Sequence, residues 1–221
     1  MRNLVIYGDG IHAERICHYI ETEKVDNIIA FTNEEARITR TIIMNHPVIS
    51  LSELKNRLGE KGIEDYSLVI AFGYSQMNNI RKKVYNECKS MGFCIASYIS
   101  KNAMVFSKGI GEGSIVLPGA FIGIGTSIGN CCLISETSYV GHNITMGDYN
   151  FVSANVAIGG FVQIKNNCFI GVHSTVKDNV VLDDYTLVGA AANIVKSTDA
   201  YGVYVGNPAK KLEHKSVEVK I

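Results

Sequence analysis

The chain has 221 residues, 47% of them hydrophobic, and its 21 Lys and Arg residues balance its 21 Asp and Glu residues. This length supports one or two domains with hydrophobic cores. A neutral chain without a basic run gives no reason to expect nucleic acid or an anionic membrane as a partner. No segment approaches the roughly 18 consecutive apolar residues that insert into a bilayer, and the N-terminus lacks the pattern of a secretory signal, so we expect a cytoplasmic protein.

The six cysteines predict no disulfide framework, because they form no CxxC pair and no scaffold spacing. Several fall where a strand would place a small apolar side chain. We therefore interpret them as reduced thiols of the core.

The first hundred residues alternate between predicted strands and helices. Apolar runs predict strands at 3–7, 27–31, 68–72 and 93–98. Helices are expected after the first strand to about residue 21, at 51–58 after a turn around His46, and at about 77–91. Alternation at this spacing favours a small parallel sheet flanked by helices. Residues 1–100 are therefore predicted to form a small α/β (βαβ) N-terminal domain.

Glycine and polar residues follow three of these strands. Ligands of parallel sheets bind beyond the carboxyl ends of the strands, which here carry GDG at 8–10, TNE at 32–34 and GYS at 73–75. The Gly-x-Gly turn presents backbone N–H groups and a helix N-terminus to a phosphate. We expect one ligand pocket at these ends. The alternative is that the glycines only allow strand and helix to pack closely.

The same turn departs from the fingerprint of a dinucleotide site. Ala13 stands at the third glycine, and Asn33 stands where an acidic ribose partner is expected, although Glu34 is adjacent. A domain of about 100 residues is also short for a dinucleotide fold. The prediction is a single nucleotide or a nucleotide diphosphate, with His12 as either a binding residue or a core residue.

From Met104 to Ile194, every sixth residue is Ile, Val, Leu or Met. This period fits neither a helix nor an ordinary strand. It is typical of a parallel β-helix with three hexads in each coil, about five coils in all. The residue after each aliphatic is often Gly, as expected at corners with unusual φ and ψ. The residue four positions after the aliphatic is mostly small or β-branched, with Ile144 and Asn150 as exceptions.

These hexads assign residues 101–200 to a three-sided parallel β-helix, followed by a C-terminal tail at 201–221. His142 is its candidate catalytic residue, because it lies two positions after Val140 and its ring is predicted to project outward. A neutral imidazole can take a proton from an attacking amine or hydroxyl. The alternative is a surface histidine without a role. His173, one position later in its own hexad, serves as the comparison.

Four features together resemble one family. They are YGDGIHA at 7–13, AFG at 71–73 with IRKK at 80–83, the hexads, and the ending GVYVGNPAK at 202–210. Over almost its whole length the chain is similar to the NeuD/PglD group of bacterial sugar acyltransferases. Many acyltransferases share the hexads, whereas the small N-terminal domain with its Gly-rich turn and His12 makes the match specific.

This resemblance implies a homotrimer of left-handed β-helices with an acetyl-CoA cleft between neighbouring subunits. The N-terminal domain is then expected to hold the nucleotide of a sugar substrate, and His142 to act as general base, with no metal required. The implied sugar-nucleotide site comprises Gly10, Ile11, His12, Asn33, Glu34 and Gly73. The implied acetyl-CoA cleft comprises Asn150, Phe151, Gly160, Val172 and Ala190, with Lys210 and Lys211 near the CoA phosphates.

The chain departs from the family pattern at three places. Asn143 follows the predicted base where the N-acetyltransferases often have a Glu, and an amide holds an imidazole tautomer without stabilising an imidazolium by charge. Glu136 is a candidate substitute. Phe151 replaces a second histidine of some relatives. Asn33 and Glu34 replace acidic residues that face the nucleotide base, which leaves UDP, dTDP and GDP open.

The leading hypothesis is an acetyl-CoA-dependent N-acetyltransferase that acts on a nucleotide-linked 4-amino-4,6-dideoxy sugar in surface-glycan biosynthesis. Direct attack is expected, with His142 as base, Asn143 beside it, and backbone N–H groups polarising the thioester. An O-acetyltransferase acting on a sialic acid or related sugar is one alternative. A non-catalytic nucleotide-sugar-binding β-helix is the other. The length of the acyl group stays open.

Overall fold

The computed structural model describes residues 1–62 and 65–220. The chain forms two units, one of Met1–Gly73 with Lys83–Tyr98, and one of Tyr74–Lys82 with the chain from Ile99 to the C-terminus. The sequence predicts a single boundary at residue 100, whereas the structure groups Tyr74–Lys82 with the second unit. Helix α3 (Asn79–Ser90) therefore begins in the second unit and ends in the first.

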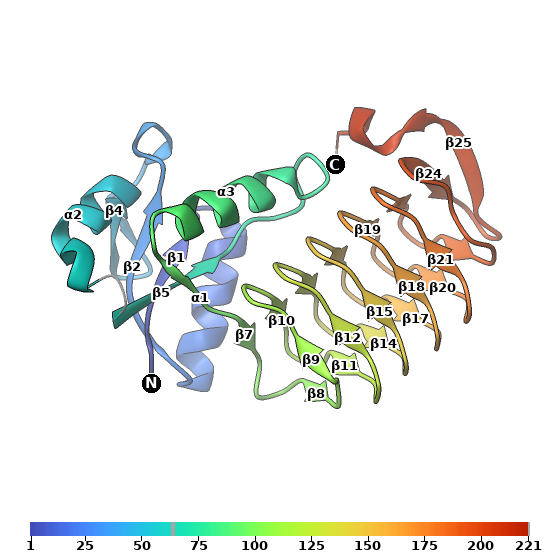
Figure 1. Ribbon diagram of the computed structural model, residues 1–221, viewed down its shortest axis with the longest axis horizontal. Helices are drawn as coiled ribbons and strands as arrows, with labels where there is room; N and C mark the ends of the chain where they lie inside the picture. Colours follow the sequence, from blue (N-terminus) through green and yellow to red (C-terminus); the bar gives the residue numbers. More distant parts are fainter. Residues whose placement is uncertain (63–64, 221) are drawn as a thin grey trace. The chain divides into compact units, whose positions relative to one another are not determined.

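The first unit contains a six-stranded sheet in the order β3-β4-β2-β1-β5-β6 (Figure 1). All neighbours are parallel except β3 and β4. Its elements are β1 (Asn3–Tyr7), α1 (Ile11–Glu23), β2 (Asn27–Asn33), the 3-10 helix η1 (Glu35–Arg37), β3 (Ile42–Ile43), β4 (His46–Ser50), α2 (Leu51–Gly62), β5 (Tyr66–Ile70) and β6 (Cys94–Ile95). The α/β prediction is confirmed. Residues 4–7 of the central strand β1 are at most 1% exposed, as expected for a strand covered on both faces.

Two local predictions for this unit differ from the structure. The run 93–98 forms β6 and part of a second short strand, β7 (Tyr98–Ile99), instead of one strand. His46, expected in a turn, is the first residue of β4. The turn precedes it, at Met44 and Asn45, whose φ angles are 47° and 65°. Two left-handed residues suit a tight antiparallel turn, so β3 and β4 form a hairpin. Within the described residues, no helix is both long and apolar enough to cross a membrane.

The second unit is a left-handed parallel β-helix whose coils build three sheets (Figure 1). Each short strand pairs with its equivalent in the next coil, as Ile115 does with Leu133. The first sheet contains β7, β10 (Ile115–Val116), β13 (Leu133–Ile134), β16 (Phe151–Val152), β19 (Phe169–Ile170), β22 (Leu187–Val188), β24 (Gly202–Val205) and β25 (Lys210–Lys215). The second contains β8 (Met104–Val105), β11 (Phe121–Ile122), β14 (Tyr139–Val140), β17 (Ala157–Ile158), β20 (Thr175–Val176) and β23 (Asn193–Ile194). The third contains β9 (Gly109–Ile110), β12 (Ser127–Ile128), β15 (Thr145–Met146), β18 (Gln163–Ile164) and β21 (Val181–Leu182).

The segment expected as a C-terminal tail is partly built into this unit. β24 pairs in parallel with β22, and β25 folds back antiparallel onto β24. A 3-10 helix, η3 (Ser216–Glu218), follows β25. The β-helical sheet therefore continues past residue 200.

The inward aliphatic residues form the core of the β-helix. The hexad residues from Val116 to Ile194 are at most 4% exposed, and the two exceptional residues Ile144 and Asn150 are buried as well. Met104 is 55% exposed, and Val105 takes its place opposite Ile122. The prediction for Met104 is wrong because the first coil is one residue short of the hexad spacing.

The glycines that follow the aliphatics have a different cause from the one predicted. Left-handed φ angles lie instead at the third residue after each aliphatic from Ile110 to Val188. These positions are Gly113, Gly119, Gly125, Cys131, Thr137, Asn143, Tyr149, Asn155, Phe161, Asn167, His173, Asn179, Tyr185 and Ala191. At Gly171, a Cβ would lie 2.7 Å from the backbone nitrogen of Ala190 and the carbonyl oxygen of Val188. Close contact with the next coil, not backbone freedom, requires glycine there.

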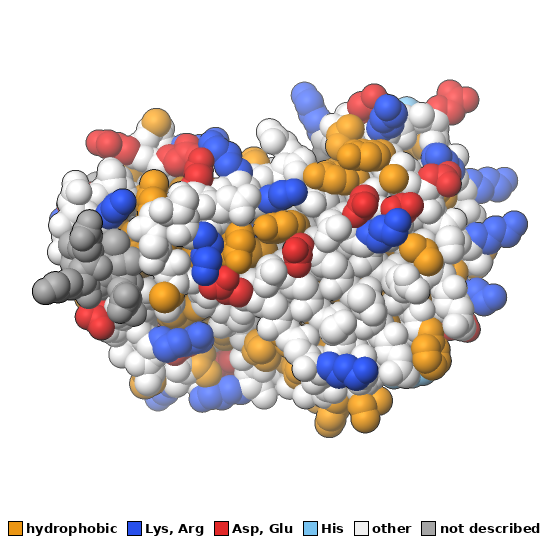
Figure 2. All heavy atoms as spheres, viewed as in Figure 1, with side chains coloured by type: hydrophobic (Ala, Val, Ile, Leu, Met, Phe, Trp, Pro, Cys, Tyr) orange, Lys and Arg blue, Asp and Glu red, His pale blue; other side chains and the backbone are white. Residues whose placement is uncertain are grey.

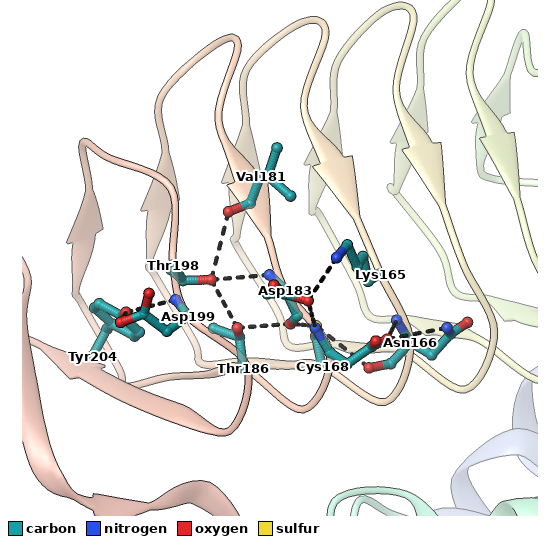
Figure 3. A network of polar contacts seen from close by, with 10 residues as sticks. Lys165, Asn166, Cys168, Val181, Asp183, Thr186, Thr198, Asp199 and Tyr204 are labelled. Carbon is teal, nitrogen blue, oxygen red and sulfur yellow. Dashed lines mark hydrogen bonds and ion pairs between the residues drawn. The ribbon is translucent and has the colours of Figure 1, made fainter.

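A column of amide and carboxylate side chains ties successive coils at one corner. The side-chain oxygen of each accepts a hydrogen bond of 2.7–2.9 Å from a backbone N–H of the preceding coil. The column consists of Asn130, Asp148, Asn166 and Asp184. In the last coils, Lys165 pairs with Asp183 at 2.9 Å, and Thr198 accepts the Asp183 N–H (Figure 3). The hydrogen bonds to backbone N–H groups satisfy donors at the stacked corners.

Replacing Gly171 with Ala is expected to lower the free energy of unfolding by about 1–3 kcal/mol, the usual cost of overpacking. Gly109→Ala is the control, because no atom lies within 4 Å of a Cβ placed there. Urea unfolding of both variants measures the difference. Equal stability of the two would contradict the role assigned to coil contact.

Candidate active site

A cavity of about 630 Å³ lies at the carboxyl ends of β1, β2 and β5 in the first unit. Five of the six residues predicted for the sugar-nucleotide site line it, namely Gly10, Ile11, His12, Asn33 and Gly73. Glu34 is not among the lining residues. Its carboxylate pairs with Arg37 at 3.1 Å and Lys83 at 3.7 Å.

Asn33 forms part of the pocket wall rather than a free amide. Its side chain is buried, its Nδ2 donates to Asp9 Oδ1 at 2.9 Å, and its Oδ1 accepts the N–H of Glu34 at 2.9 Å. Both ends of the amide are therefore used within the protein. Asn33 positions the Asp9 carboxylate, which itself lines the cavity.

Three lining residues that the sequence did not point to come from the end of η1 and the segment after it: Arg37, Thr39 and Arg40. Arg40 donates to the backbone carbonyl of Asp9 and pairs with Glu14 at 2.8 Å. Two guanidinium groups therefore border a cavity that also meets the N-terminus of α1, where backbone N–H groups lack helical partners. This combination suits an anionic ligand such as a diphosphate. The sequence signal for this part of the pocket was the presence of two arginines, Arg37 and Arg40, shortly after the second strand.

His12 lies against Gly73 in this cavity. A Cβ at Gly73 would come within 3.1 Å of the His12 ring, so glycine leaves room for the imidazole. Arg15 Nη2 lies 3.2 Å from His12 Nδ1, and a guanidinium can only donate. In the neutral ring, Nε2 then carries the proton. His12 lines the cavity, so it stays a candidate binding residue.

His142 projects from a corner of the β-helix in the second unit and is exposed. Its ring lies over Gly160 of the next coil, where a Cβ would come within 2.6 Å of Cε1 and Nε2. The ring of Phe161 meets it edge-on, with centroids 5.0 Å apart. His173 differs because it occupies a left-handed corner itself, with φ 57°. The His142 ring can occupy this position only because residue 160 is a glycine.

Asn143 is the side-chain hydrogen-bond partner of the His142 ring. Its Nδ2 lies 3.1 Å from His142 Nδ1. Because an amide nitrogen only donates, Nδ1 accepts in this arrangement, and Nε2 of the neutral ring carries the proton. A half-turn of the amide would place Oδ1 at Nδ1 and free the lone pair of Nε2. The residue in contact with Nδ1 is Asn143. The structure therefore gives no support to Glu136 as the residue that replaces the family's Glu beside the base.

Two residues expected in the acetyl-CoA cleft are buried, which is a correction. Asn150 is 1% exposed, and its amide donates to the carbonyls of Gly147 and Lys165 and accepts the N–H of Cys168. Phe151 is 3% exposed and stacks on Phe169 with centroids 5.5 Å apart. The Asn150 amide joins coils inside the β-helix, whereas Phe151 faces outward from the first sheet and the Tyr74 ring covers it, with centroids 4.9 Å apart. Neither side chain therefore remains a candidate for contact with CoA.

The other residues expected in that cleft are accessible. Gly160 is half-buried, and Val172, Ala190 and Lys210 are exposed. Lys211, by contrast, pairs with Asp199 at 2.8 Å. Basic side chains project from the end of this unit that carries β24 and β25 (Figure 2).

A shallow cavity of about 450 Å³ lies on the outer face of the second sheet of the β-helix. It is lined by Tyr139, Ala157, Ile158, Gly159, Thr175, Val176, Lys177, Asp178, Asn193 and Val195. None of the residues expected to bind acetyl-CoA is among these lining residues. Its lining residue Gly159 is the chain neighbour of Gly160, which lies beneath the His142 ring.

Asn150→Ala is expected to lower the free energy of unfolding by about 1–3 kcal/mol, because it leaves the buried Cys168 N–H and Lys165 carbonyl unpaired. Urea unfolding and CoA titration of the folded variant separate the two possible roles. Unchanged stability with weakened CoA binding would contradict the interior placement and return Asn150 to the cleft.

Comparison with known proteins identifies the first unit and the fold. Residues 3–88 match the family model described as the PglD N-terminal domain. The chain is similar to the acetyltransferase domain of PglB from Neisseria gonorrhoeae FA1090, at 22% identity and a TM-score of 0.83, over 96% of this chain and 100% of that one. It is similar to a mutant of perosamine N-acetyltransferase from Caulobacter crescentus, at 24% identity and a TM-score of 0.86, over 97% and 98%. WeeI from Acinetobacter baumannii AYE gives 21% identity and a TM-score of 0.83, over 96% and 100%.

At these identities the solved structures establish the fold of the chain, and the family model establishes the nature of its N-terminal segment. The predicted resemblance is confirmed in its N-terminal part, a PglD N-terminal domain at residues 3–88, and in the fold that the whole chain shares with these structures.

Proposed function

We propose that this protein is an acetyl-CoA-dependent N-acetyltransferase that acylates the amine of a nucleotide-linked 4-amino-4,6-dideoxy sugar, a reaction of surface-glycan biosynthesis. The observation that carries the proposal is the exposed imidazole of His142, seated on Gly160 and hydrogen-bonded to Asn143. An outward histidine held on two sides is placed to accept a proton from a substrate. The first unit adds a cavity with anion-binding groups for the nucleotide diphosphate.

The comparisons support this assignment. The Caulobacter perosamine N-acetyltransferase structure is described as a complex with CoA and GDP-perosamine. A PglB structure is described as a complex with acetyl coenzyme A. Both share the fold of this chain over nearly its whole length, which supports a CoA thioester and an amino sugar as its two substrates.

In the proposed reaction, the sugar amine attacks the thioester carbonyl of acetyl-CoA. A C–N bond forms, the C–S bond breaks, CoA leaves as a thiolate, and the one proton that the amine loses passes by way of the base to the departing sulfur, which gives the thiol. His142 takes that proton through Nε2. To accept at Nε2, the neutral ring must carry its own proton on Nδ1. The amide of Asn143 therefore turns so that Oδ1 accepts the Nδ1–H.

The cavity of the first unit is proposed to hold the nucleotide diphosphate. The N-terminus of α1, Arg37 and Arg40 are assigned to the phosphates. The Asp9 carboxylate, held by Asn33, is assigned to a donor group of the ribose or the base. The panel of UDP-, dTDP- and GDP-linked sugars described below identifies the nucleobase.

The working assembly is proposed to be a homotrimer, with acetyl-CoA between neighbouring β-helices beside Gly160, Val172, Ala190 and Lys210. The outer face of the second sheet carries Met104 and Phe106, which are 55% and 58% exposed. On the same face, Phe121 stacks on Tyr139 with ring planes 11° apart. A contiguous apolar patch of this kind marks an interaction surface. A second copy of a β-helix would bury it.

The reaction is tested with acetyl-CoA and a panel of UDP-, dTDP- and GDP-linked 4-amino-4,6-dideoxy sugars. We expect one sugar nucleotide to gain one acetyl group by mass. His142→Ala should lower kcat by about 10²–10⁴-fold, the usual contribution of a general base, while circular dichroism stays unchanged. His173→Ala is the matched control and should keep the wild-type rate.

The remaining outcomes of this experiment are also decisive. Acetylation of hydroxyl sugars alone would replace the N-acetyltransferase with the O-acetyltransferase. No product from any acceptor, with sugar-nucleotide binding retained, would favour the non-catalytic binding protein. A wild-type rate in His142→Ala would exclude His142 as the base.

Asn143→Ala is expected to lower kcat by at least about tenfold and to leave both KM values near wild type, because it removes the group that sets the tautomer. Asn143→Asp is the matched variant, since it keeps the shape, tolerates the left-handed φ of 53° and can only accept. We expect its kcat to equal or exceed that of wild type. An Asp variant as impaired as the Ala variant would refute acceptance by Oδ1.

A further inference from the structure

Three side chains with metal-binding donor atoms converge in the first unit, outside the cavity described above. They are Cys17 and Glu21 of α1 and His46 of β4. Their nearest donor atoms all lie within 4.8 Å of one another. His46 Nε2 already lies 2.7 Å from Glu21 Oε1.

The local fold explains this convergence. Residues 17 and 21 are one helical turn apart, so they face the same side of α1. The tight turn of the β3–β4 hairpin precedes His46 and delivers its ring to that side. Arg40, in the chain just before β3, pairs with Glu14 on α1 at 2.8 Å. The hairpin and the segment before it therefore meet one face of α1 at two places.

The donor set is that of a zinc-type ion. A thiolate, an imidazole nitrogen and a carboxylate oxygen are its ordinary ligands, and three protein ligands leave a fourth position for water. Cys17 is fully buried, whereas the side chains of His46 and Glu21 are 20% and 43% exposed. The sulfur is thus shielded on the protein side, and the opposite side is open to an entering ion and its water.

An ion bound at this site would displace the proton of the Cys17 thiol to solvent, so the thiolate would form together with the metal–sulfur bond.

We propose that Cys17, Glu21 and His46 bind one divalent zinc-type ion that links α1 to the β3–β4 hairpin. The inference does not rest on the proposed acyltransfer reaction. Its structural consequence concerns the neighbouring cavity, since the start of α1 and the segment with Arg37 and Arg40 form two of its walls. The ion holds these walls together.

The test uses the full chain, freed of metal with a chelator and titrated with Co²⁺ under reducing conditions. We expect one Co²⁺ per chain with a thiolate-to-metal charge-transfer band, and displacement by Zn²⁺. Cys17→Ser should abolish the band. His46→Gln and Glu21→Gln should each weaken binding by at least about tenfold. Cys94→Ser is the control, because Cys94 is the exposed cysteine and should leave the titration unchanged.

Absence of a stoichiometric band in the wild type would overturn the proposal. A band that survives in Cys17→Ser, or disappears in Cys94→Ser, would overturn it as well by placing the metal elsewhere. His46→Gln and Glu21→Gln change partly exposed side chains and keep the test valid if Cys17→Ser does not fold. Unaltered Co²⁺ affinity in both of these variants would reduce the cluster to an ion pair.

Discussion

The distance between successive coils of the β-helix is the constraint on which the second unit depends. Parallel pairing brings the backbones so close that a Cβ at Gly123, Gly141 or Gly171 would fall within 2.8 Å of backbone atoms in the next coil. The triangular interior then accepts one aliphatic side chain from each side, and the corners repeat at left-handed φ angles. The six-residue period records this stacking geometry rather than the intrinsic preference of any residue for strand.

The same constraint builds the candidate active site and limits it. Coil contact holds the ring of His142 over Gly160 and beside Phe161, so the imidazole is displayed by a rigid corner and not by a loop. At the next corner along the chain, both the nitrogen and the oxygen of the Asn150 amide are hydrogen-bonded to backbone groups of the β-helix. A polar residue in a β-helix is thus either outside and available, or inside and used by the stacking. Its position in the hexad decides which.

Periodicity predicted the β-helix, its core and the outward direction of His142, because a repeated geometry leaves a repeated pattern. It failed at Met104, where the first coil is shorter than the repeat and Val105 faces inward instead. In the first unit, strand ends predicted the position of the pocket. They could not indicate Arg37 and Arg40, which reach it from a segment whose path depends on η1 and the β3–β4 hairpin. Resemblance placed Phe151 in a cleft, whereas its packing on Phe169 depends on tertiary contacts that no local pattern reveals.

Asn143 combines the structural and the chemical demands at one position. Its backbone sits at a left-handed corner with φ 53° and donates to the carbonyl of Ile124, a conformation that Asn tolerates better than Glu. Its amide meets His142 Nδ1 and can orient the ring. An amide does not stabilise an imidazolium as a carboxylate does. In the proposed reaction, Asn143 can therefore orient the His142 ring for proton transfer but brings no charge to the imidazolium. More of the rate must then come from the alignment of amine and thioester and from N–H groups at the carbonyl oxygen.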